Sequence, residues 1–409
     1  MSVLTIFVLT LVACTLVYTA ALVGFMLGLR RLRHNRRTDF ERWPFVSVIM
    51  PARNEADVLE RTLQSLLAQD YPGQWEIIVV DDRSTDHTPQ VLRRVALESD
   101  RLRPIRVTEE NPRSPKKHAL ALGIKHSQGE IIATTDADCV YDPAWIRSMV
   151  SHMAPEVGVV AGLTVFDLPE NRVPAWQKIQ WLDFFAQNSL AAGAAGAGVP
   201  SSCNGSNLFY RREVYDTVSG FGTSVSIVSG DDVLFTQRVA KNTPWKIIYA
   251  AVPEATVRSL PVLSVRELFQ QRLRWASKGL TYKPSMLMFL FGIYAYYMLL
   301  GAVPFVLLAK QVIIWPLVCV LAWKLAWDYA TVRIGCRVFQ QDRLRPYFLP
   351  YSIIQLYLYP FFGLAGLMLP FRWKGDWYRT PRLPRRLRRG ILRFRRLMRS
   401  RRPATSSSR

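Results

Sequence analysis

Four short motifs carry the side chains of this chain that could do chemistry. Three of them pair aspartates beside apolar runs, and the fourth combines Gln, Arg and Trp shortly before a long hydrophobic span. Carboxylates bind divalent cations and act as general bases, while Arg donors match phosphate oxygens. The chain is therefore expected to handle a metal and a phosphate-bearing ligand close to a membrane. The motif residues are Asp81 with Asp82, Asp136 with Asp138, Asp231 with Asp232, and Gln271 with Arg274 and Trp275.

Asp136 and Asp138 are expected to hold the metal. They flank Ala137 after the apolar run 131–134, and in a strand-like D-x-D arrangement both carboxylates point the same way. Mg²⁺ or Mn²⁺ needs a few carboxylates together with phosphate oxygens and water. A metal at this place would bridge a diphosphate and neutralise the charge that develops on a leaving group.

Asp81 and Asp82 are expected to read a nucleobase. They follow the apolar run 75–80, and a carboxylate can accept a hydrogen bond from uracil N3–H, which selects uridine over cytidine. Lys116 opens a predicted helix and is interpreted as a contact to the nucleotide or its phosphates. The alternative for Lys116 is a solvated surface lysine.

Asp231 and Asp232 stand at the start of another predicted helix. One of them could be a general base, which must lie within hydrogen-bond reach of the group that it deprotonates. The alternative is an acid pair that stabilises a helix N-terminus without chemistry.

Gln271, Arg274 and Trp275 lie at helical spacing and share one face of a predicted helix at 264–279. Arg can clamp a diphosphate with paired donors, and Trp offers a flat apolar surface to a sugar ring. The alternative is an interfacial helix that places Trp and Arg at headgroup depth.

The elements that must position these motifs alternate strand with helix. Strands are expected at 45–50, 75–80, 102–107 and 130–135, and helices at 55–69, 88–97 and 116–126. The strand at 75–80 is apolar except for Glu76, as expected where helices cover both faces of a sheet. In such α/β sheets the ligand lies outside the carboxyl ends of the strands, where the acid motifs fall.

Hydrophobic spans flank this region. Residues 4–29 are long enough to cross a bilayer and have Arg on the C-terminal flank, which predicts an uncleaved anchor with the following residues in the cytoplasm. Further spans are expected at 286–309, 312–332 and 347–369. The middle one carries Lys324 and Asp328, which could pair as i, i+4 neighbours.

Three other segments have their own patterns. The Ala-Gly stretch 191–198 is interpreted as a flexible loop or a linker. Residues 373–378 are interpreted as an aromatic anchor at headgroup level. Apolar residues at spacings of four, three and four in 387–398 predict a basic amphipathic helix, with a disordered tail as the alternative.

Charge and cysteine usage exclude other classes. The net charge is +22, but residues 371–409 hold 14 Arg and one Lys against one acid, so the charge points to anionic lipid headgroups rather than to nucleic acid. The five cysteines form no C-x-x-C pair, which argues against a disulfide framework and against a zinc site.

The four motifs, in this order and between hydrophobic spans, resemble those of the family-2 inverting glycosyltransferases. The resemblance covers roughly residues 44–275. It implies an α/β fold of Rossmann-like character, the nucleotide-diphospho-sugar transferase (GT-A) fold, with flanking transmembrane helices. The implied reaction transfers a sugar from a nucleotide-sugar donor, UDP-linked by expectation, to a lipid or lipid-linked acceptor with inversion and with a divalent cation.

The resemblance also assigns residues, with Asp232 as the general base. Two positions depart from the family pattern, because Ala121 replaces an Asn and Asp231 replaces a Glu. On the acceptor and sugar side it places Gly205, Asn207, Asp231, Gln271, Arg274 and Trp275, with Asn207 hydrogen-bonding a sugar hydroxyl; the alternative there is a tight turn before a strand. On the donor side it places Pro51, Ala52, Arg53, Glu55, Asp81, Asp82, Lys116, Asp136, Ala137 and Asp138.

The expected organisation follows from the spans and the resemblance together. A catalytic domain in the cytoplasm would be attached to the inner or plasma membrane. The expected segments are an anchor at 1–29, a basic linker at 30–43, the glycosyltransferase domain at 44–262, an interfacial helix at 263–284, a transmembrane region of two or three segments at 285–370 and an Arg-rich tail at 371–409.

Two alternatives for the function stay open at the level of sequence. A processive polysaccharide synthase would use the same motifs, although the few spans favour single transfer. A catalytically inactive membrane scaffold would keep the fold, but it leaves the acid motifs unexplained.

Overall fold

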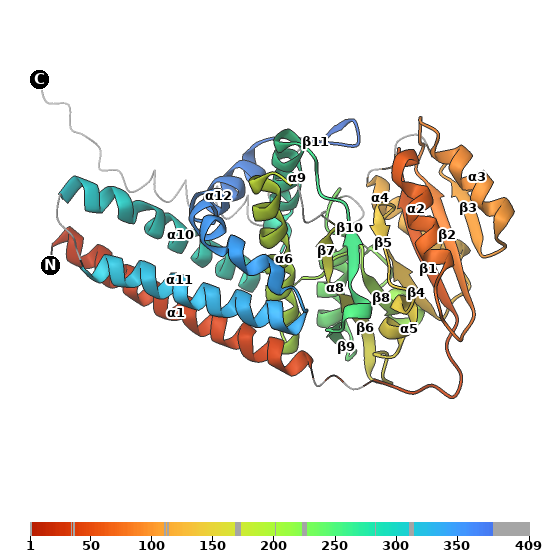
Figure 1. The fold of residues 1–409 in the computed structure, drawn as a ribbon, viewed down its shortest axis with the longest axis horizontal. Helices are drawn as coiled ribbons and strands as arrows, with labels where there is room; N and C mark the ends of the chain where they lie inside the picture. Colours follow the sequence, from red (N-terminus) through yellow and green to blue (C-terminus); the bar gives the residue numbers. More distant parts are fainter. Residues whose placement is uncertain are drawn as a thin grey trace, which may run out of the picture.

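The computed structural model describes residues 2–378 except 34, 36, 110, 111, 113, 168–172, 201, 223–226, 283 and 311–314. An α/β unit lies at one end of the molecule and a group of long helices at the other (Figure 1). The α/β unit is built on a sheet of seven strands. In spatial order these are β3 (Leu102–Arg106), β2 (Trp75–Asp81), β1 (Val46–Ala52), β4 (Ile131–Thr134), β8 (Leu208–Arg211), β6 (Val157–Gly162) and β9 (Lys246–Ala250).

The sheet is parallel from β3 to β4, and β8 runs antiparallel to both of its neighbours. β1 is a central strand, with Val46 opposite Trp75 on one side and Ile131 on the other. Because β1, β2 and β4 run the same way, their carboxyl ends meet at one edge. The strands and helices predicted from the sequence for this region are confirmed.

Helices cover both faces of the sheet, which explains the continuous apolar runs. On β1, Val48 and Met50 belong to one core and Ile49 to the other, as the two-residue period of a strand requires. The helices of the α/β unit are α2 (Ala56–Leu67), α3 (Thr88–Glu98), α4 (Pro115–His126), α5 (Trp145–Val150), α7 (Arg212–Thr217) and α8 (Asp231–Asn242).

A small second sheet extends from the carboxyl edge. It consists of β5 (Cys139–Val140), β10 (Val257–Ser259) and β7 (Thr164–Phe166), with the 3₁₀ turn η2 (Pro253–Ala255) before β10. β10 leads into α9 (Val265–Ser277), whose first turn is capped because Ser264 Oγ accepts from the Glu267 backbone N–H at 3.2 Å. This confirms the helix predicted at 264–279.

The Ala-Gly stretch is not a loop, and this expectation was wrong. Most of it forms the last turns of α6 (Ala175–Gly196), which packs against α1 (Val3–Leu32). A Cβ at Gly28 would lie 1.9 Å from the Gly193 carbonyl oxygen, and one at Gly196 would lie 2.3 Å from the Gly28 oxygen. Glycine lets the two helix backbones approach closely here, and packing outweighs its low helix propensity.

Three helices among the described residues are long and apolar enough to cross a membrane, namely Val3–Leu32, Pro284–Ala309 and Asp342–Met368. The chain is therefore associated with a membrane through its long apolar helices. The other elements of this part are α10 (Pro284–Lys310), α11 (Trp315–Val338), α12 (Phe348–Met368) and the 3₁₀ turns η3 (Gly279–Thr281) and η4 (Asp342–Tyr347).

α11 carries the predicted ion pair. Lys324 Nζ lies 2.6 Å from Asp328 Oδ2, and both side chains are almost fully buried. The hydroxyl of Tyr18 on α1 donates to the other oxygen of Asp328 at 2.8 Å. The pairing expected from the i, i+4 spacing is confirmed.

After α12 the chain forms a hairpin of β11 (Phe371–Trp373) and β12 (Asp376–Tyr378). The turn is closed by Lys374 and Gly375, both at positive φ. The amphipathic helix predicted at 387–398 lies outside the described residues.

Candidate functional site

A cavity of about 760 Å³ opens at the carboxyl edge of the large sheet, between the α/β unit, α9 and the β11–β12 hairpin. Its size suits a nucleotide-sized ligand. Three of the four sequence motifs contribute side chains to its wall. The predicted site residues that line it are Pro51, Ala52, Arg53, Glu55, Asp82, Lys116, Asp136, Ala137, Asp138, Gln271 and Arg274.

Asp81 lies beside this cavity at the end of β2, and one of its carboxylate oxygens has no hydrogen-bond partner among the described residues. Oδ1 accepts from the Ser84 backbone N–H at 2.9 Å. Oδ2 is buried and has no hydrogen-bond partner among the described residues, although Arg106 Nε lies 3.8 Å away. A buried acceptor without a donor is costly, so the site fits a ligand that brings an N–H group.

The neighbouring loops are locked to each other. Asn54 donates its backbone N–H to Ser84 Oγ at 3.0 Å, and its side-chain oxygen accepts from Thr85 N–H at 2.8 Å. Asn54 and Arg83 both adopt positive φ, which is uncommon outside glycine. Asp82 pairs with Arg83 Nε at 2.8 Å, so its carboxylate is held at the cavity wall. Strained residues held by such bonds are typical of ligand loops.

The two carboxylates of the D-x-D motif have different partners. Asp136 pairs with Lys116 Nζ at 2.6 Å. Asp138 accepts from Ser259 Oγ at 3.0 Å, and burial followed by the Asp136 charge raises its pKa. A buried carboxylate that faces another carboxylate is stabilised by an added cation. The residues present therefore fit a divalent metal, with Asp136 and Asp138 as its protein ligands.

No third His, Cys, Asp or Glu completes a cluster with Asp136 and Asp138 in the part of the chain that the structure describes. A metal held by two carboxylates needs oxygens from a ligand and from water. This favours a metal that enters together with a phosphate-bearing ligand.

Asp231 and Asp232 lie behind Lys116 at the start of α8, outside the residues that line the cavity. Lys116 Nζ is 3.4 Å from Asp231 Oδ2, so this lysine links the acid pair to Asp136. Burial would lower the pKa of Lys116, but the charges of Asp136 and Asp231 raise it above its ordinary value. Lys116 is thus not a solvated surface lysine.

Asp232 has the contacts of a helix start and of a charged site at once. Its Oδ2 accepts from the Gly205 N–H at 3.1 Å and its Oδ1 from the Val233 N–H at 2.6 Å. Lys278 Nζ lies 3.8 Å from Oδ1. A Cβ at Gly205 would lie 3.1 Å from Asp231 Oδ2, so the backbone at this glycine lies close to the acid pair. The interpretation as a helix start and the interpretation as a base remain compatible.

α9 presents Gln271 and Arg274 to the cavity, but not Trp275. The Trp275 ring stacks on Phe184 with 5.8 Å between centroids, and the Arg272 guanidinium covers it at 4.8 Å. The predicted role of Trp275 as a platform for a sugar ring stays a prediction, and in this structure protein groups occupy these contacts. Trp275 lies about 100° from Arg274 around the helix, on the side of Arg272, and faces α6.

Asn207 is also held by structural contacts, which leave it no side-chain donor for the predicted sugar contact. It is fully buried, and its amide donates both hydrogens, to the carbonyl oxygens of Leu163 at 2.9 Å and Ala255 at 2.8 Å. Its side-chain oxygen accepts from Trp145 Nε1 at 3.0 Å. Because no donor is left over, Asn207 joins three segments instead of binding a sugar hydroxyl.

The β11–β12 hairpin supplies site residues that the sequence interpretation as an aromatic anchor missed. Lys374 Nζ lies 2.5 Å from Glu55 Oε1, and Asp376 Oδ2 lies 3.0 Å from Arg53 Nη1. The Arg274 guanidinium stacks over Trp373 at 5.3 Å. Opposite charges beside a glycine turn, matched by Arg53 and Glu55, are the signal that could have indicated these contacts.

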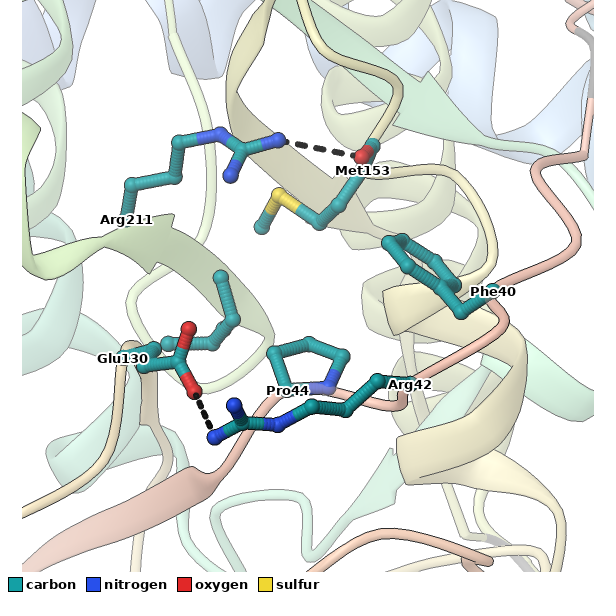
Figure 2. A pocket seen from close by; sticks show the side chains of 7 residues that line it. Phe40, Arg42, Pro44, Glu130, Met153 and Arg211 are labelled. Carbon is teal, nitrogen blue, oxygen red and sulfur yellow. Dashed lines mark hydrogen bonds and ion pairs between the residues drawn. The ribbon is translucent and has the colours of Figure 1, made fainter.

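Another cavity, of about 190 Å³, lies near the amino ends of β1 and β4 (Figure 2). Arg42 and Glu130 pair across it at 3.7 Å, and Arg211 donates to the Met153 carbonyl at 3.1 Å. It contains none of the motif residues. The cavity at the carboxyl edge is therefore the candidate functional site, because the motif residues line it and not the smaller cavity.

Comparison with known proteins agrees with this geometry. Residues 47–218 match the model of "Glycosyl transferase family 2". A beta-monoglucosyldiacylglycerol synthase of Nostoc sp. is 31% identical over 262 residues, covering 61% of this chain and 52% of that protein. The glycosyltransferase AglE of Haloferax volcanii is 30% identical over 197 residues, covering 48% of this chain and 61% of that protein. The chain thus spans about half the length of the first relative and three fifths of the second.

A solved structure shares the fold. The mannosyltransferase PcManGT from Pyrobaculum calidifontis, in complex with GDP-Man and Mn²⁺, aligns with a TM-score of 0.51 at 20% identity, covering 88% of this chain and 95% of that one. The predicted fold class, a GT-A-like α/β sheet with flanking apolar helices, is confirmed.

Proposed function

Since residues 47–218 form a glycosyl transferase family 2 domain, we propose that this chain is an inverting glycosyltransferase. It transfers a sugar from a nucleotide-sugar donor to a hydroxyl of a lipid or lipid-linked acceptor. The catalytic domain faces the cytoplasm from the inner or plasma membrane, attached by the apolar helices.

One observation carries this proposal. A single cavity is lined by Asp82, by the D-x-D pair, by Lys116 and by Gln271 and Arg274, which come from four separate parts of the chain. Base-reading, metal-binding and phosphate-binding groups together match the parts of a nucleotide-sugar. A structural role alone does not require them to converge on one cavity.

In the proposed reaction the acceptor oxygen attacks the anomeric carbon on the face opposite the nucleotide. Asp232 takes the proton of the acceptor hydroxyl as the new C–O bond forms. The bond from the anomeric carbon to the diphosphate breaks, and the nucleoside diphosphate leaves with the electron pair. One base suffices, because inversion in a single displacement needs no covalent intermediate.

The charges around the cavity suit a diphosphate. Arg274 is half-buried, and desolvation lowers its pKa, while the carboxylates of Asp231 and Asp136 oppose this effect. Its guanidinium can donate paired hydrogen bonds to phosphate oxygens. Asp136 and Asp138 would hold the divalent cation, Mg²⁺ or Mn²⁺, which supplies electrostatic stabilisation of the leaving diphosphate when bound.

The Asp81 oxygen that lacks a hydrogen-bond partner among the described residues favours some nucleobases of the donor over others. Uracil N3 and guanine N1 both carry a hydrogen that it can accept, whereas cytosine N3 and adenine N1 are themselves acceptors. We infer a UDP-sugar from the family resemblance, and GDP-sugars are the competing class that the same carboxylate admits.

The cavity wall also supports an amphipathic acceptor. Beyond the charged groups, apolar residues of the β10–α9 connection and of the hairpin complete the wall, among them Leu260, Val262, Leu263 and Trp377. Leu263 and Trp377 are 77% and 64% exposed. Exposed apolar side chains at the rim favour an acceptor with a lipid part, in keeping with the glycolipid synthase among the relatives.

The proposal is tested by nucleotide release from detergent-purified protein. A panel of UDP- and GDP-sugars is offered with lipid extract and with Mg²⁺, Mn²⁺ or chelator. We expect metal-dependent release from one donor, a loss of about 10²- to 10⁴-fold in the Asp232→Asn variant, and nucleotide binding retained there. The Asp138→Asn variant should lose the metal dependence of nucleotide binding.

The product distinguishes a single-sugar transferase from a processive synthase and from an inactive scaffold. One sugar added to a lipid supports the proposal, whereas a ladder of products identifies a processive synthase. If no donor is turned over and no nucleotide binds, the proposal fails and an inactive scaffold is favoured.

A further inference from the structure

α9 brings Gln271 and Arg274 to the cavity at the carboxyl edge of the large sheet, called the donor cavity from here on. The rotation of α9 therefore decides whether the two side chains reach the donor. The neighbouring face of α9, which carries Arg272 and Trp275, contacts α6 rather than the cavity. Residues three apart on a helix lie on one face. The contact with α6 therefore adds to the packing of α9 on α12 and β11 in setting the face that α9 turns to the donor.

A single carboxylate lies at the centre of that contact. Arg272 Nη2 forms an ion pair with Asp183 Oδ2, and the two side chains are only 12% and 13% exposed. Gln187 donates to the same oxygen at 3.0 Å. In low-dielectric surroundings such a pair holds its geometry more firmly than a surface ion pair does.

The other oxygen of Asp183 reaches the apolar helices. Tyr359 on α12 donates its hydroxyl to Asp183 Oδ1 at 2.9 Å. The Tyr359 ring lies 5.5 Å from that of Tyr297 on α10, and Tyr294 of α10 donates its hydroxyl to the Tyr359 backbone carbonyl at 2.9 Å. Asp183 thus joins three helices, α6, α9 and α12, which lie close together at the centre of the molecule (Figure 1).

Other buried polar groups on α6 and α12 lack hydrogen-bond partners in the described part of the chain. Gln180 on α6 lies one turn before Asp183, and both ends of its amide are buried without a hydrogen-bond partner among the described residues. On α12, Ser352 Oγ and Gln355 Oε1 are in the same condition. Asp183, by contrast, uses both carboxylate oxygens in contacts with α9 and α12.

We propose that Asp183 is a positioning residue for the transfer reaction, holding α9 through Arg272 and α12 through Tyr359 so that Gln271 and Arg274 face the donor. This inference rests on the proposed function and adds a residue far from the four motifs. A displacement of α12 would therefore move α9, and with it the side chains of Gln271 and Arg274, through Tyr359 and Asp183.

Steady-state kinetics test the role of Asp183 directly. In the Asp183→Asn variant we expect kcat to fall about 10- to 100-fold, because a helix displaced by about 1 Å misplaces the Arg274 donors in the transition state. The donor KM should change less than threefold. The Glu60→Gln variant breaks a surface ion pair between α2 and α3 and should keep kcat within twofold.

Variants of the partner separate positioning from general damage. Arg272→Lys keeps a cation and should retain activity within about fivefold, whereas Arg272→Gln should lose as much as Asp183→Asn. The double variant Asp183→Asn with Arg272→Gln should be no worse than either single one. Multiplied losses in the double variant would show that the two residues act independently and would overturn the proposal.

Hydrogen–deuterium exchange tests the structural core of the inference without any assay of transfer. Asp183→Asn and the milder Tyr359→Phe should both increase exchange in α9 while leaving α4 unchanged. Unchanged exchange in α9 overturns the inference whether or not the protein is a transferase. Increased exchange in a protein that turns over no donor supports the role of Asp183 in holding α9 but overturns the proposed function and with it the role in transfer.

Discussion

At the scale of single residues, Asn207 shows how a polar side chain in a motif can be wholly structural. Its amide joins the Trp145 indole to the carbonyl groups of Leu163 and Ala255. In the Asn207→Ala variant these three buried groups lose their partner, at a cost of about 1–3 kcal/mol each. We expect the melting temperature to drop by about 5 °C or more, with the donor KM of the remaining folded protein unchanged.

A large rise in donor KM at an unchanged melting temperature would contradict this assignment. It would return Asn207 to the sugar side of the site. The Asn204→Ala variant serves as a control in the same loop. Among the described residues, the Asn204 side chain accepts hydrogen bonds only from Ser206, two residues away.

His152 predicts how stability depends on pH. It is 2% exposed, and its Nδ1 lies 2.8 Å from the Ser148 carbonyl oxygen. Burial, with a smaller effect of Arg37, lowers the pKa of His152 below 6.5, although the Ser148 carbonyl opposes this. The unfolded chain therefore binds a proton more readily than the folded one, and stability falls as the pH drops below about 6.5.

Melting temperatures of the wild type and of the His152→Gln variant at pH 7.5 and 5.5 check this prediction. We expect the wild type to lose more on acidification than the variant does. Equal losses would show that the protonation of His152 does not contribute.

At the scale of elements, the close contact of α1 and α6 predicts opposite effects at two glycines of one helix. A Cβ at Gly28 would collide with the Gly193 carbonyl, whereas a Cβ at Gly24 meets nothing within 4 Å. Replacing a helical glycine with alanine normally stabilises by about 1 kcal/mol. We expect Gly24→Ala to raise or keep the melting temperature and Gly28→Ala to lower it.

If Gly28→Ala proved as stable as Gly24→Ala, the two helices would not be in backbone contact. The matched pair keeps helix propensity constant, so only packing differs. Thermal unfolding in one detergent is sufficient for the comparison.

The sequence predicted most elements of the α/β unit because their signals are local. The run 75–80 is apolar except for Glu76, and the helical spacing at 55–69 is regular, so β2 and α2 were placed to within a few residues. The Ala-Gly stretch was misplaced because its helical state depends on α1, which lies far away in the chain. Local composition cannot represent such a tertiary contact.

The site was predictable to a similar extent and for a similar reason. Carboxylates at strand ends, such as Asp82 and Asp138, reach the cavity because parallel strands share an edge. Asn207 and Trp275 were assigned from motif resemblance, yet their partners come from segments that the motifs do not contain. The opposite charges beside Gly375 indicated that Lys374 and Asp376 could form ion pairs, but their partners depend on α12 returning the chain to the α/β unit.

At the scale of the whole molecule, the contacts at the two ends of α12 predict on which side of the membrane the β11–β12 hairpin lies. Before α12, the Tyr347 ring lies 5.4 Å from Lys178 of α6. After it, the hairpin pairs with Arg53 and Glu55 at the donor cavity. We therefore expect α12 to be re-entrant or interfacial and residues after it to lie on the side of the catalytic domain.

Labelling with a membrane-impermeant maleimide in oriented vesicles checks this topology. Single cysteines at Trp377→Cys and Leu97→Cys should react from the same side, and Ser2→Cys from the other. The exposed Cys319 and the half-exposed Cys14 are first replaced by serine, since the other three cysteines are buried. Reaction of Trp377→Cys together with Ser2→Cys would show that α12 crosses the membrane.

The hairpin after α12 also sets a limit for protein engineering. A chain shortened to residues 44–262 would keep the seven-stranded sheet and all three acid pairs, and it would lack the apolar helices that make purification difficult. It would also lack Gln271, Arg274, Trp373 and Lys374, which form the opposite side of the donor cavity. Making this enzyme soluble by truncation would leave half of a binding site, so a soluble variant has to keep α9 and the hairpin and replace the lipid-facing surface instead.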